Sequence, residues 1–206
     1  MFELINEEGS TKGRYVIANR FIEKGTIILR ERPLLVAEDV YDALYRIYGI
    51  DDDDECIDSD DVKTFRTAFE TLAPHTIDKY VPSYNELQDD IETLPNYIQE
   101  FFSQLTWTPQ RLRLLVAKFH RNAFTYNSQQ CAILIQGAMF NHSCNNNLDF
   151  HEDNRGCFVF KTNRNIMKGE ELCVTYIETN VSRNKRMHTL QYNYGFQCSC
   201  TKCKQK

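Results

Sequence analysis

The amino-acid sequence predicts an α+β domain that is mainly β and is interrupted by a helical insertion. Short β-branched segments lie near the beginning of the chain and again in its final third. Between them, from about residue 38 to about residue 119, apolar residues recur at helical spacing. The 206 residues, 42% of them hydrophobic, suffice for one domain with a core and a sizeable insertion, and two large domains are not expected. The sequence contains no internal repeat and no Ser/Gly linker.

The first block of the chain predicts two strands joined by a turn. The segments 13–25 and 26–36 are short and rich in β-branched side chains. The dipeptide of Lys24 and Gly25 lies between them and favours the turn.

The middle of the chain predicts helices. Two stretches place aromatic and aliphatic residues at helical spacing: Tyr41, Leu44, Tyr45 and Tyr48, and further on Ile98, Phe101, Phe102 and Leu105. Thr106 or Thr108, followed by Pro109, is typical of a helix start. The apolar face of the helix that follows consists of Leu112, Leu115, Val116 and Phe119.

The final third of the chain again predicts strands. Three segments have the patterns of buried strands: residues 131–136, 156–160 and 171–176. A second Lys-Gly turn, at Lys168 and Gly169, precedes the last of them. Residues 180–191 favour a short basic helix because they include Arg183, Lys185 and Arg186.

The formal net charge of −5 hides a strong segregation of charge. Residues 38–100 contain 18 of the 29 acidic residues and 4 of the 24 basic ones, so this segment carries −14 and the rest of the chain +9. The acidic run 51–55 favours a solvated surface loop, and it also suits electrostatic attraction of a Lys/Arg-rich partner. A calcium loop is disfavoured, because the run lacks the turn glycine and Cys56 stands at a ligand position. We predict no direct binding to nucleic acid.

The sequence shows no membrane or secretion signal. No segment approaches the about 18–20 apolar residues that span a bilayer, and the N-terminus has no basic segment followed by an apolar one. We therefore expect an intracellular protein, nuclear and/or cytoplasmic. In that reducing compartment, the eight cysteines favour free thiols or metal ligands over four disulfides.

Three cysteines near the C-terminus have the spacing of a metal site: Cys198, Cys200 and Cys203. Tetrahedral zinc needs a fourth ligand, for which Cys144 is the best candidate because polar residues flank it, and His142 is the alternative. Other cysteines fall in strand patterns or in the acidic run: Cys157, Cys173 and Cys56. Four thiolates leave no open coordination position, so the zinc would be structural and would join the C-terminus to the loop at 141–147.

Taken one by one, the residues beside this cluster have ordinary interpretations. Asn141 and His142 would cap a turn, and Tyr176 and Phe196 would be a strand aromatic and a core aromatic. Together they belong to motifs that follow one another along nearly the whole chain: residues 13–25, 122–124, 141–147, 169–176 and 194–203. On these motifs the chain resembles the SET-domain protein lysine methyltransferases, in the branch that normally carries a MYND zinc finger.

The resemblance implies a SET-domain fold in which the C-terminal segment threads under a preceding loop as a pseudo-knot. It implies a SET domain at 1–197, with the acidic helical insertion at 38–119, and a zinc-binding post-SET tail at 198–206. S-adenosylmethionine, the methyl donor, would be bound by Arg14, Tyr15, Asn122, Asn141, His142, Tyr176 and Phe196. Tyr176 and Tyr194 would line the lysine channel as catalytic residues. The implied ligands of a structural Zn²⁺ are Cys144, Cys198, Cys200 and Cys203.

The partner implied by the resemblance is a protein with an exposed lysine, a histone or another protein, and we expect a monomer. The chain departs from the family pattern at Tyr15, where a glycine is usual, and at Asn146, where a proline is usual. The insertion at 38–119 has no Cys/His array for a MYND finger. The chain ends three residues after Cys203, so we expect no C-terminal helical lobe of the kind that many relatives have.

Methyl transfer to lysine needs an unprotonated amine in line with the methyl group. A narrow aromatic channel disfavours the ammonium form, and Tyr176 would hydrogen-bond the amine without acting as a strong base. A different class of function is a SET scaffold without turnover that binds a basic protein partner. A zinc-dependent hydrolase is disfavoured, because the sequence offers no open metal site.

Overall fold

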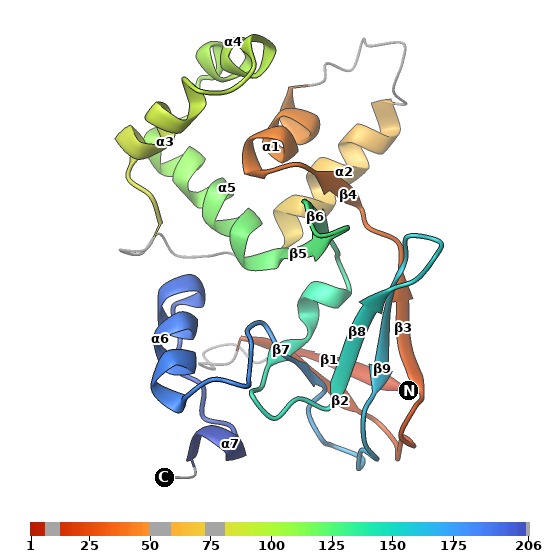
Figure 1. Ribbon diagram of the computed structural model, residues 1–206. Coiled ribbons are helices and arrows are strands. Elements are labelled where there is room, and N and C mark those ends of the chain that lie inside the picture. Colours follow the sequence, from red (N-terminus) through yellow and green to blue (C-terminus); the bar gives the residue numbers. More distant parts are fainter. Residues whose placement is uncertain (7–12, 50–58, 73–80, 205–206) are drawn as a thin grey trace. The chain divides into compact units, whose positions relative to one another are not determined.

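The computed structural model describes residues 1–6, 13–49, 59–72 and 81–204, and for residues 59–62 the backbone alone (Figure 1). The acidic run 51–55 and Cys56 lie outside the described residues. The chain forms two compact units. Unit 1 comprises Met1–Pro33 and Gln136–Lys206, and unit 2 comprises Leu34–Ile135.

Two sheets of unit 1 are antiparallel. β1 (Phe2–Asn6) pairs with β2 (Arg14–Ala18). β3 (Ile27–Glu31), β9 (Phe158–Thr162) and β8 (Leu148–Glu152) form the second sheet, in the order β3-β9-β8, and Figure 1 shows them side by side. Fully buried side chains of these strands form part of the core: Leu148, Phe158 and Phe160.

The rest of unit 1 consists of a parallel strand pair and short helices. The 3₁₀ helix η1 (Gly137–Met139) leads into β7 (Asn141–His142), which pairs in parallel with β10 (Cys173–Val174). Two helices follow towards the C-terminus: α6 (Arg183–Tyr194) and α7 (Thr201–Lys204).

Both predicted Lys-Gly turns are present in unit 1. Gly25 has φ +86° and Gly169 has φ +83°, a backbone region that favours glycine. The Gly25 amide donates to the Thr162 carbonyl at 2.9 Å, and the Gly169 amide donates to the Ala18 carbonyl at 2.7 Å. The two turns therefore anchor strand ends that lie far apart in the sequence.

Unit 2 contains a small antiparallel sheet and five described helices. The strands are β4 (Leu35–Ala37), β6 (Gln130–Ile133) and β5 (Ala123–Tyr126), in the order β4-β6-β5. The helices are α1 (Val40–Tyr48), α2 (Ser59–Thr71), α3 (Tyr84–Ile91), α4 (Asn96–Gln104) and α5 (Pro109–Asn122). Among the described helices, none combines the length and the apolar character needed to cross a bilayer.

Side chains at the helix starts explain where three of these helices begin. Asp39 accepts hydrogen bonds from the first amides of α1, and Ser83 with Glu86 forms a capping box on α3. Thr108 caps α5 and Pro109 occupies its first turn, which confirms the second of the two predicted starts.

The predicted α+β class is confirmed. Unit 1 is mainly β, whereas most described residues of unit 2 are helical. The predicted strands at 131–136 and 156–160 correspond to β6 and β9, and the basic helix corresponds to α6. The predicted helices around Tyr41 and Ile98 correspond to α1 and α4. The sequence patterns missed β1, β5, η1, β7, β8, α2, α3 and α7. The threading of the C-terminal segment and the domain boundaries stay predictions.

Two predicted strands differ from those found. The single strand at 26–36 is wrong, because β3 ends at Glu31 and β4 begins at Leu35 in the other unit, with Pro33 between them, whose nitrogen cannot donate to a sheet. The strand at 171–176 shortens to β10, because the Tyr176 amide donates to a histidine ring rather than to a neighbouring strand.

A polar network in unit 2 joins α1, α2 and α5 at Glu70. The Glu70 carboxylate accepts hydrogen bonds from Tyr48 and Arg111, and Lys118 Nζ lies 3.6 Å from it. Burial alone would raise the pKa of Glu70, but these partners outweigh burial and lower it. A lowered folded-state pKa means that Glu70 stabilises unit 2 fully above the unfolded pKa of about 4.3, and that this contribution is lost as the pH falls further.

We expect Glu70→Gln to lower the free energy of unfolding at pH 7. The substitution leaves the Lys118 ammonium, whose side chain is 6% exposed, without its carboxylate. Since the Glu70 side chain is 34% exposed, solvent screening limits the loss to about 1–2 kcal/mol. Urea denaturation measures the difference, which should narrow towards pH 4. The exposed Glu92→Gln is the control, and an equal effect of both variants would contradict the role of the network.

Candidate active site and metal centre

The parallel pair of β7 and β10 brings the predicted Asn-His pair beside the predicted tyrosine. Asn141 lies opposite Cys173, and His142 lies opposite Val174. Beyond the pair, the Ser143 amide donates to the Val174 carbonyl at 2.9 Å. Residues from two distant parts of the sequence therefore form one continuous surface in unit 1.

Asn141 connects this pair to the first strand block. Its Nδ2 donates to the Arg14 carbonyl and to Glu171 Oε1, both at 3.1 Å. Arg14 and Tyr15 lie at the start of β2 and are half-buried. Gly13, before them, has φ +63°, which a larger residue adopts only with strain. The structure thus places Arg14 next to Asn141, two of the residues that are predicted to bind the cofactor.

His142 is held between Tyr176 and Cys144. Its Nδ1 accepts from the Tyr176 amide at 3.0 Å, so the ring proton lies on Nε2, 3.2 Å from Cys144 Sγ. Burial, together with the charge of Arg186, lowers the pKa of His142 to about 4, so the imidazole is neutral at pH 7. The Phe196 ring lies 6.0 Å from the imidazole, centroid to centroid.

Tyr176 presents a neutral phenol. Its hydroxyl donates to the Phe140 carbonyl at 2.8 Å, and burial raises its pKa well above the ordinary value. Because the proton is used for this bond, the phenol oxygen can accept a hydrogen bond from another donor. No sequence pattern indicated a role for Phe140, because the contact is made by its main-chain carbonyl.

Tyr194 lies beside Tyr176. The two ring centroids are 5.0 Å apart, and the Tyr194 hydroxyl donates to the Tyr176 carbonyl at 3.3 Å. Burial raises the pKa of Tyr194 as well. The Phe196 ring lies 6.5 Å from Tyr194, so three predicted aromatic residues are neighbours. Such a group of rings suits an apolar channel that admits an alkyl chain.

Four cysteine thiols converge beside His142. The sulfurs of Cys144, Cys198, Cys200 and Cys203 all lie within 4.8 Å of one another. In a tetrahedral zinc site the sulfurs are about 3.8 Å apart, so a small contraction would close the shell. The distance from Cys203 Sγ to Cys144 Sγ is already 3.5 Å. Donor type, number and placement therefore fit a tetrathiolate zinc site, and Cys144 is the fourth member of the cluster.

Protonation of these thiols opposes metal binding. Burial and the hydrogen bond from Cys203 raise the pKa of the Cys144 thiol to about 12, so a metal ion would have to displace this proton on binding. The tail that carries the other thiols is held by further bonds. Asn145 Nδ2 donates to Thr201 Oγ1 at 3.1 Å, and Lys202 Nζ donates to the Thr179 carbonyl at 2.9 Å.

Asn147 fixes the loop that carries Cys144, a task that the sequence motif did not reveal. Its side chain is 2% exposed and bonds the segment on both sides of Leu172. Nδ2 donates to the Glu171 carbonyl, and Oδ1 accepts from the Cys173 amide, both at 2.8 Å. A buried amide with both ends satisfied holds β7 and β10 in register.

Asn122, the remaining predicted cofactor residue, lies in unit 2. It is the last residue of α5, is 7% exposed, and its Nδ2 donates to the Lys118 carbonyl at 2.7 Å. Its role in cofactor binding stays a prediction.

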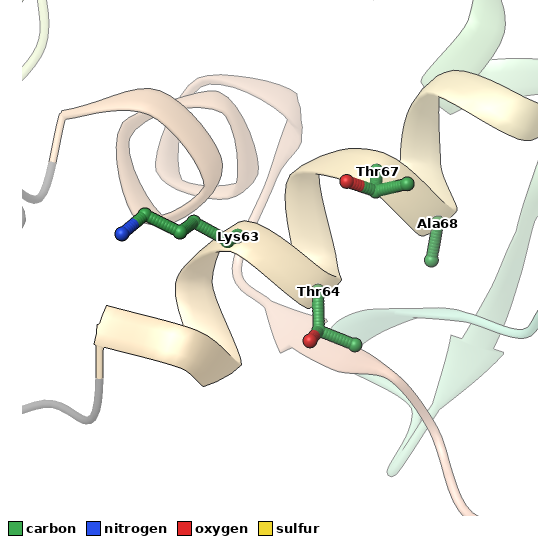
Figure 2. A pocket seen from close by; sticks show the side chains of 4 residues that line it. All are labelled: Lys63, Thr64, Thr67 and Ala68. Carbon is green, nitrogen blue, oxygen red and sulfur yellow. The ribbon is translucent and has the colours of Figure 1, made fainter.

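Two hollows in unit 2 are separate from these residues. The larger, about 610 Å³, is lined by residues of α2 alone, as Figure 2 shows: Lys63, Thr64, Thr67 and Ala68. Residues of a single helix do not provide the convergent polar groups of a ligand site. The smaller, about 240 Å³, lies among α3, α4 and the start of α5, with Trp107 in its lining.

Comparison with known proteins identifies the family. The family model of the SET domain matches residues 13–177. A SET domain-containing protein of Acanthamoeba polyphaga mimivirus is 32% identical over 203 residues, which cover 93% of this chain and 74% of that protein. A SET and MYND domain-containing protein of Dictyostelium discoideum is 27% identical, over 79% of this chain and 36% of that protein.

A solved structure has the same fold. The crystal structure of the SET domain of LSMT bound to lysine and AdoHcy has a TM-score of 0.55 at 15% identity. The match covers 95% of this chain and 52% of that one, so the chain spans about half of that structure. The predicted SET fold and the similarity to a SET and MYND protein are confirmed. The chain belongs to the SET-domain family.

Proposed function

We propose that this chain is an S-adenosylmethionine-dependent protein-lysine N-methyltransferase. The arrangement of Tyr176 carries the proposal. Its hydroxyl proton is donated to the Phe140 carbonyl, which leaves the oxygen able to accept from an amine beside the Tyr194 ring. The LSMT structure, which holds lysine and AdoHcy in a SET domain, supports this assignment.

The residues of the chain would act mainly by desolvation and positioning. Bound S-adenosylmethionine would supply a methyl group on a sulfonium sulfur. A lysine ammonium has a pKa of about 10.4 in water, and burial between the rings of Tyr176 and Tyr194 favours its neutral form. The Tyr176 oxygen would then accept an N–H bond and direct the nitrogen lone pair towards the methyl group. The lysine ammonium would lose its proton to solvent on entering the site. Neither tyrosine would have to act as the base, so both would stay neutral.

The cofactor would lie against the surface of unit 1 that is formed by Arg14, Tyr15, Asn141, His142 and Phe196. The neutral His142 ring and the Phe196 ring suit an adenine base, because both offer aromatic faces without a net charge. Zn²⁺ would be held by the four clustered thiolates as a structural ion, since they leave no position for substrate.

The proposed substrate is a lysine in a basic segment of a histone or another protein. Residues 81–108 of unit 2 contain five carboxylates and no Lys or Arg: Glu86, Asp89, Asp90, Glu92 and Glu100. All five are exposed. A field of this sign favours the approach of Lys/Arg-rich chains.

Calorimetry of the zinc-loaded protein with S-adenosylmethionine tests the cofactor assignment. We expect binding, and at least about tenfold weaker binding for Asn141→Ala, because the bonds to Arg14 and Glu171 are lost. Asn154→Ala, on an exposed turn between β8 and β9, should leave the affinity unchanged. No binding by the wild-type protein would instead favour a SET scaffold that binds a basic partner without turnover.

A further inference from the structure

α6 buries an arginine beside the four clustered thiols. Arg186 is 4% exposed. Nη1 donates to the Val181 carbonyl at 2.6 Å, and Nη2 points to Cys203 Sγ at 3.7 Å. Nε is buried and has no hydrogen-bond partner. In the described part of the chain, none of the ion pairs includes Arg186. A guanidinium stays charged at any ordinary pH. Arg186 therefore carries a buried positive charge that no carboxylate of the described residues balances.

The thiol cluster supplies the missing negative charge when it holds a metal ion. Four thiolates around one divalent cation leave an excess of two negative charges. Arg186 Nη2 points to the sulfur of one of these cysteines, Cys203, at 3.7 Å, and Cys144 Sγ lies 3.5 Å from Cys203 Sγ. The arginine therefore faces a centre of opposite charge, as a buried cation requires.

His142 provides a second N–H donor to the thiol cluster. His142 is neutral, and its Nε2 proton points at Cys144 Sγ, 3.2 Å away. The same ring contacts Tyr176 and Phe196 of the candidate cofactor surface. The side-chain donors around the thiols thus include the charged Arg186 and the neutral His142.

We propose that Arg186 is the outer-sphere counter-ion of the zinc-tetrathiolate centre and protects its thiolates from electrophiles. Hydrogen bonds and positive charge draw electron density from the sulfurs, which lowers their nucleophilicity and slows ligand loss. The proposal rests on the zinc site of the proposed function, but not on methyl transfer. A purely structural arginine would support the Val181 carbonyl and leave the reactivity of the thiolates unchanged.

The test compares zinc release from the wild-type protein and three variants. N-ethylmaleimide adds to each thiolate, and a chromophoric chelator reports the zinc that is set free. Arg186→Met removes the charge at similar volume, and Arg186→Lys retains the charge. Arg183→Met is the matched control, because Arg183 lies on the same helix but donates to the Cys203 carbonyl, at 2.7 Å, rather than to sulfur.

We expect Arg186→Met to release zinc at least about tenfold faster than the wild-type protein and to bind it about 10- to 100-fold more weakly. Arg186→Lys should fall between the two, and Arg183→Met should behave as wild type. In the cobalt-substituted protein, the sulfur-to-cobalt charge-transfer band of Arg186→Met should move to longer wavelength, because the sulfur electrons are less stabilised. A loss of packing alone would not move this band.

Equal release rates and equal cobalt spectra for the wild-type protein and Arg186→Met would overturn the proposal. If Arg186→Met fails to fold, Arg186→Lys decides. Zinc release faster than from the wild-type protein, with a cobalt band at longer wavelength, supports the proposal, and wild-type behaviour in both assays overturns it. A wild-type protein that takes up neither zinc nor cobalt would overturn the metal centre and this proposal with it, whatever its methyl-transfer activity.

Discussion

Replacing Tyr176 by Phe is expected to slow methyl transfer at least about 100-fold while the affinity for S-adenosylmethionine changes little. The variant keeps the ring that packs 5.0 Å from Tyr194, but it loses the hydroxyl that donates to the Phe140 carbonyl. Without that hydroxyl, the variant loses the oxygen that is proposed to direct the amine lone pair towards the methyl group. Single-turnover transfer of a labelled methyl group measures the rate, and calorimetry measures the cofactor affinity.

Tyr192→Phe is the matched control for this prediction. Tyr192 lies on α6 in the same unit and is 54% exposed, so its hydroxyl should not affect the rate. A wild-type rate for Tyr176→Phe would contradict the orienting role of the hydroxyl. If cofactor affinity fell as much as the rate, the Tyr176 hydroxyl would have a role in cofactor binding rather than in substrate orientation.

Replacing Cys144 by Ser is expected to abolish tight zinc binding and to lower the melting temperature by about 10 °C or more. Cys144 and Cys203 are 59 positions apart, so a bound metal ion would close a long chain segment. Releasing this closure frees the tail that carries Phe196, and the affinity for S-adenosylmethionine should fall as well. Metal analysis of the purified protein and thermal denaturation measure the two effects.

Cys157→Ser provides the control for the metal prediction. Cys157 is a half-buried free thiol outside the cluster, at the turn before β9. Its replacement should leave the zinc content unchanged. Undiminished zinc in Cys144→Ser would show that another group, with His142 nearest, supplies the fourth ligand.

The thiol cluster was predictable because much of its information is local. Cys198, Cys200 and Cys203 lie within one short segment, and their spacing alone brings the sulfurs together. The fourth member, Cys144, required the argument that its polar neighbours cannot continue a core element. The aromatic group was not predictable from local sequence. Tyr176 and Phe196 have ordinary interpretations singly, and only the ordered set of motifs indicated a shared site.

Arg186 could not be placed from the sequence. With Arg183 and Lys185 it gives α6 a basic character that is typical of a solvated face. Its burial depends on the position of Cys203, 17 residues further along the chain, which no local pattern encodes. The same holds for Asn147, whose two buried bonds join it to a segment 24–26 residues away.

The strand errors have a similar origin. β1 has mostly exposed or half-buried residues, so its sequence carries no apolar alternation, although it pairs along its full length with β2. The predicted strand at 171–176 has the right residue types, but its last amide is taken by His142. In both cases the hydrogen-bond partner, rather than the β propensity of the segment, decides the structure.

His142 joins the thiol cluster to Tyr176, the proposed catalytic residue. One ring nitrogen accepts from the Tyr176 amide, and the other points to Cys144. Loss of the metal should therefore disturb the main chain at Tyr176, and a structural ion would affect the rate without contacting substrate.

Mass spectrometry of labelled substrates tests the proposed activity most directly. The zinc-loaded wild-type protein is incubated with methyl-labelled S-adenosylmethionine and, separately, with histones and with a cell extract, and the labelled positions are mapped. Lysine methylation by this site predicts label on lysine ε-amines, with no such label from Tyr176→Phe beyond about a hundredth of the wild-type amount. Label on another residue type, or no label from a protein that binds the cofactor, would contradict it.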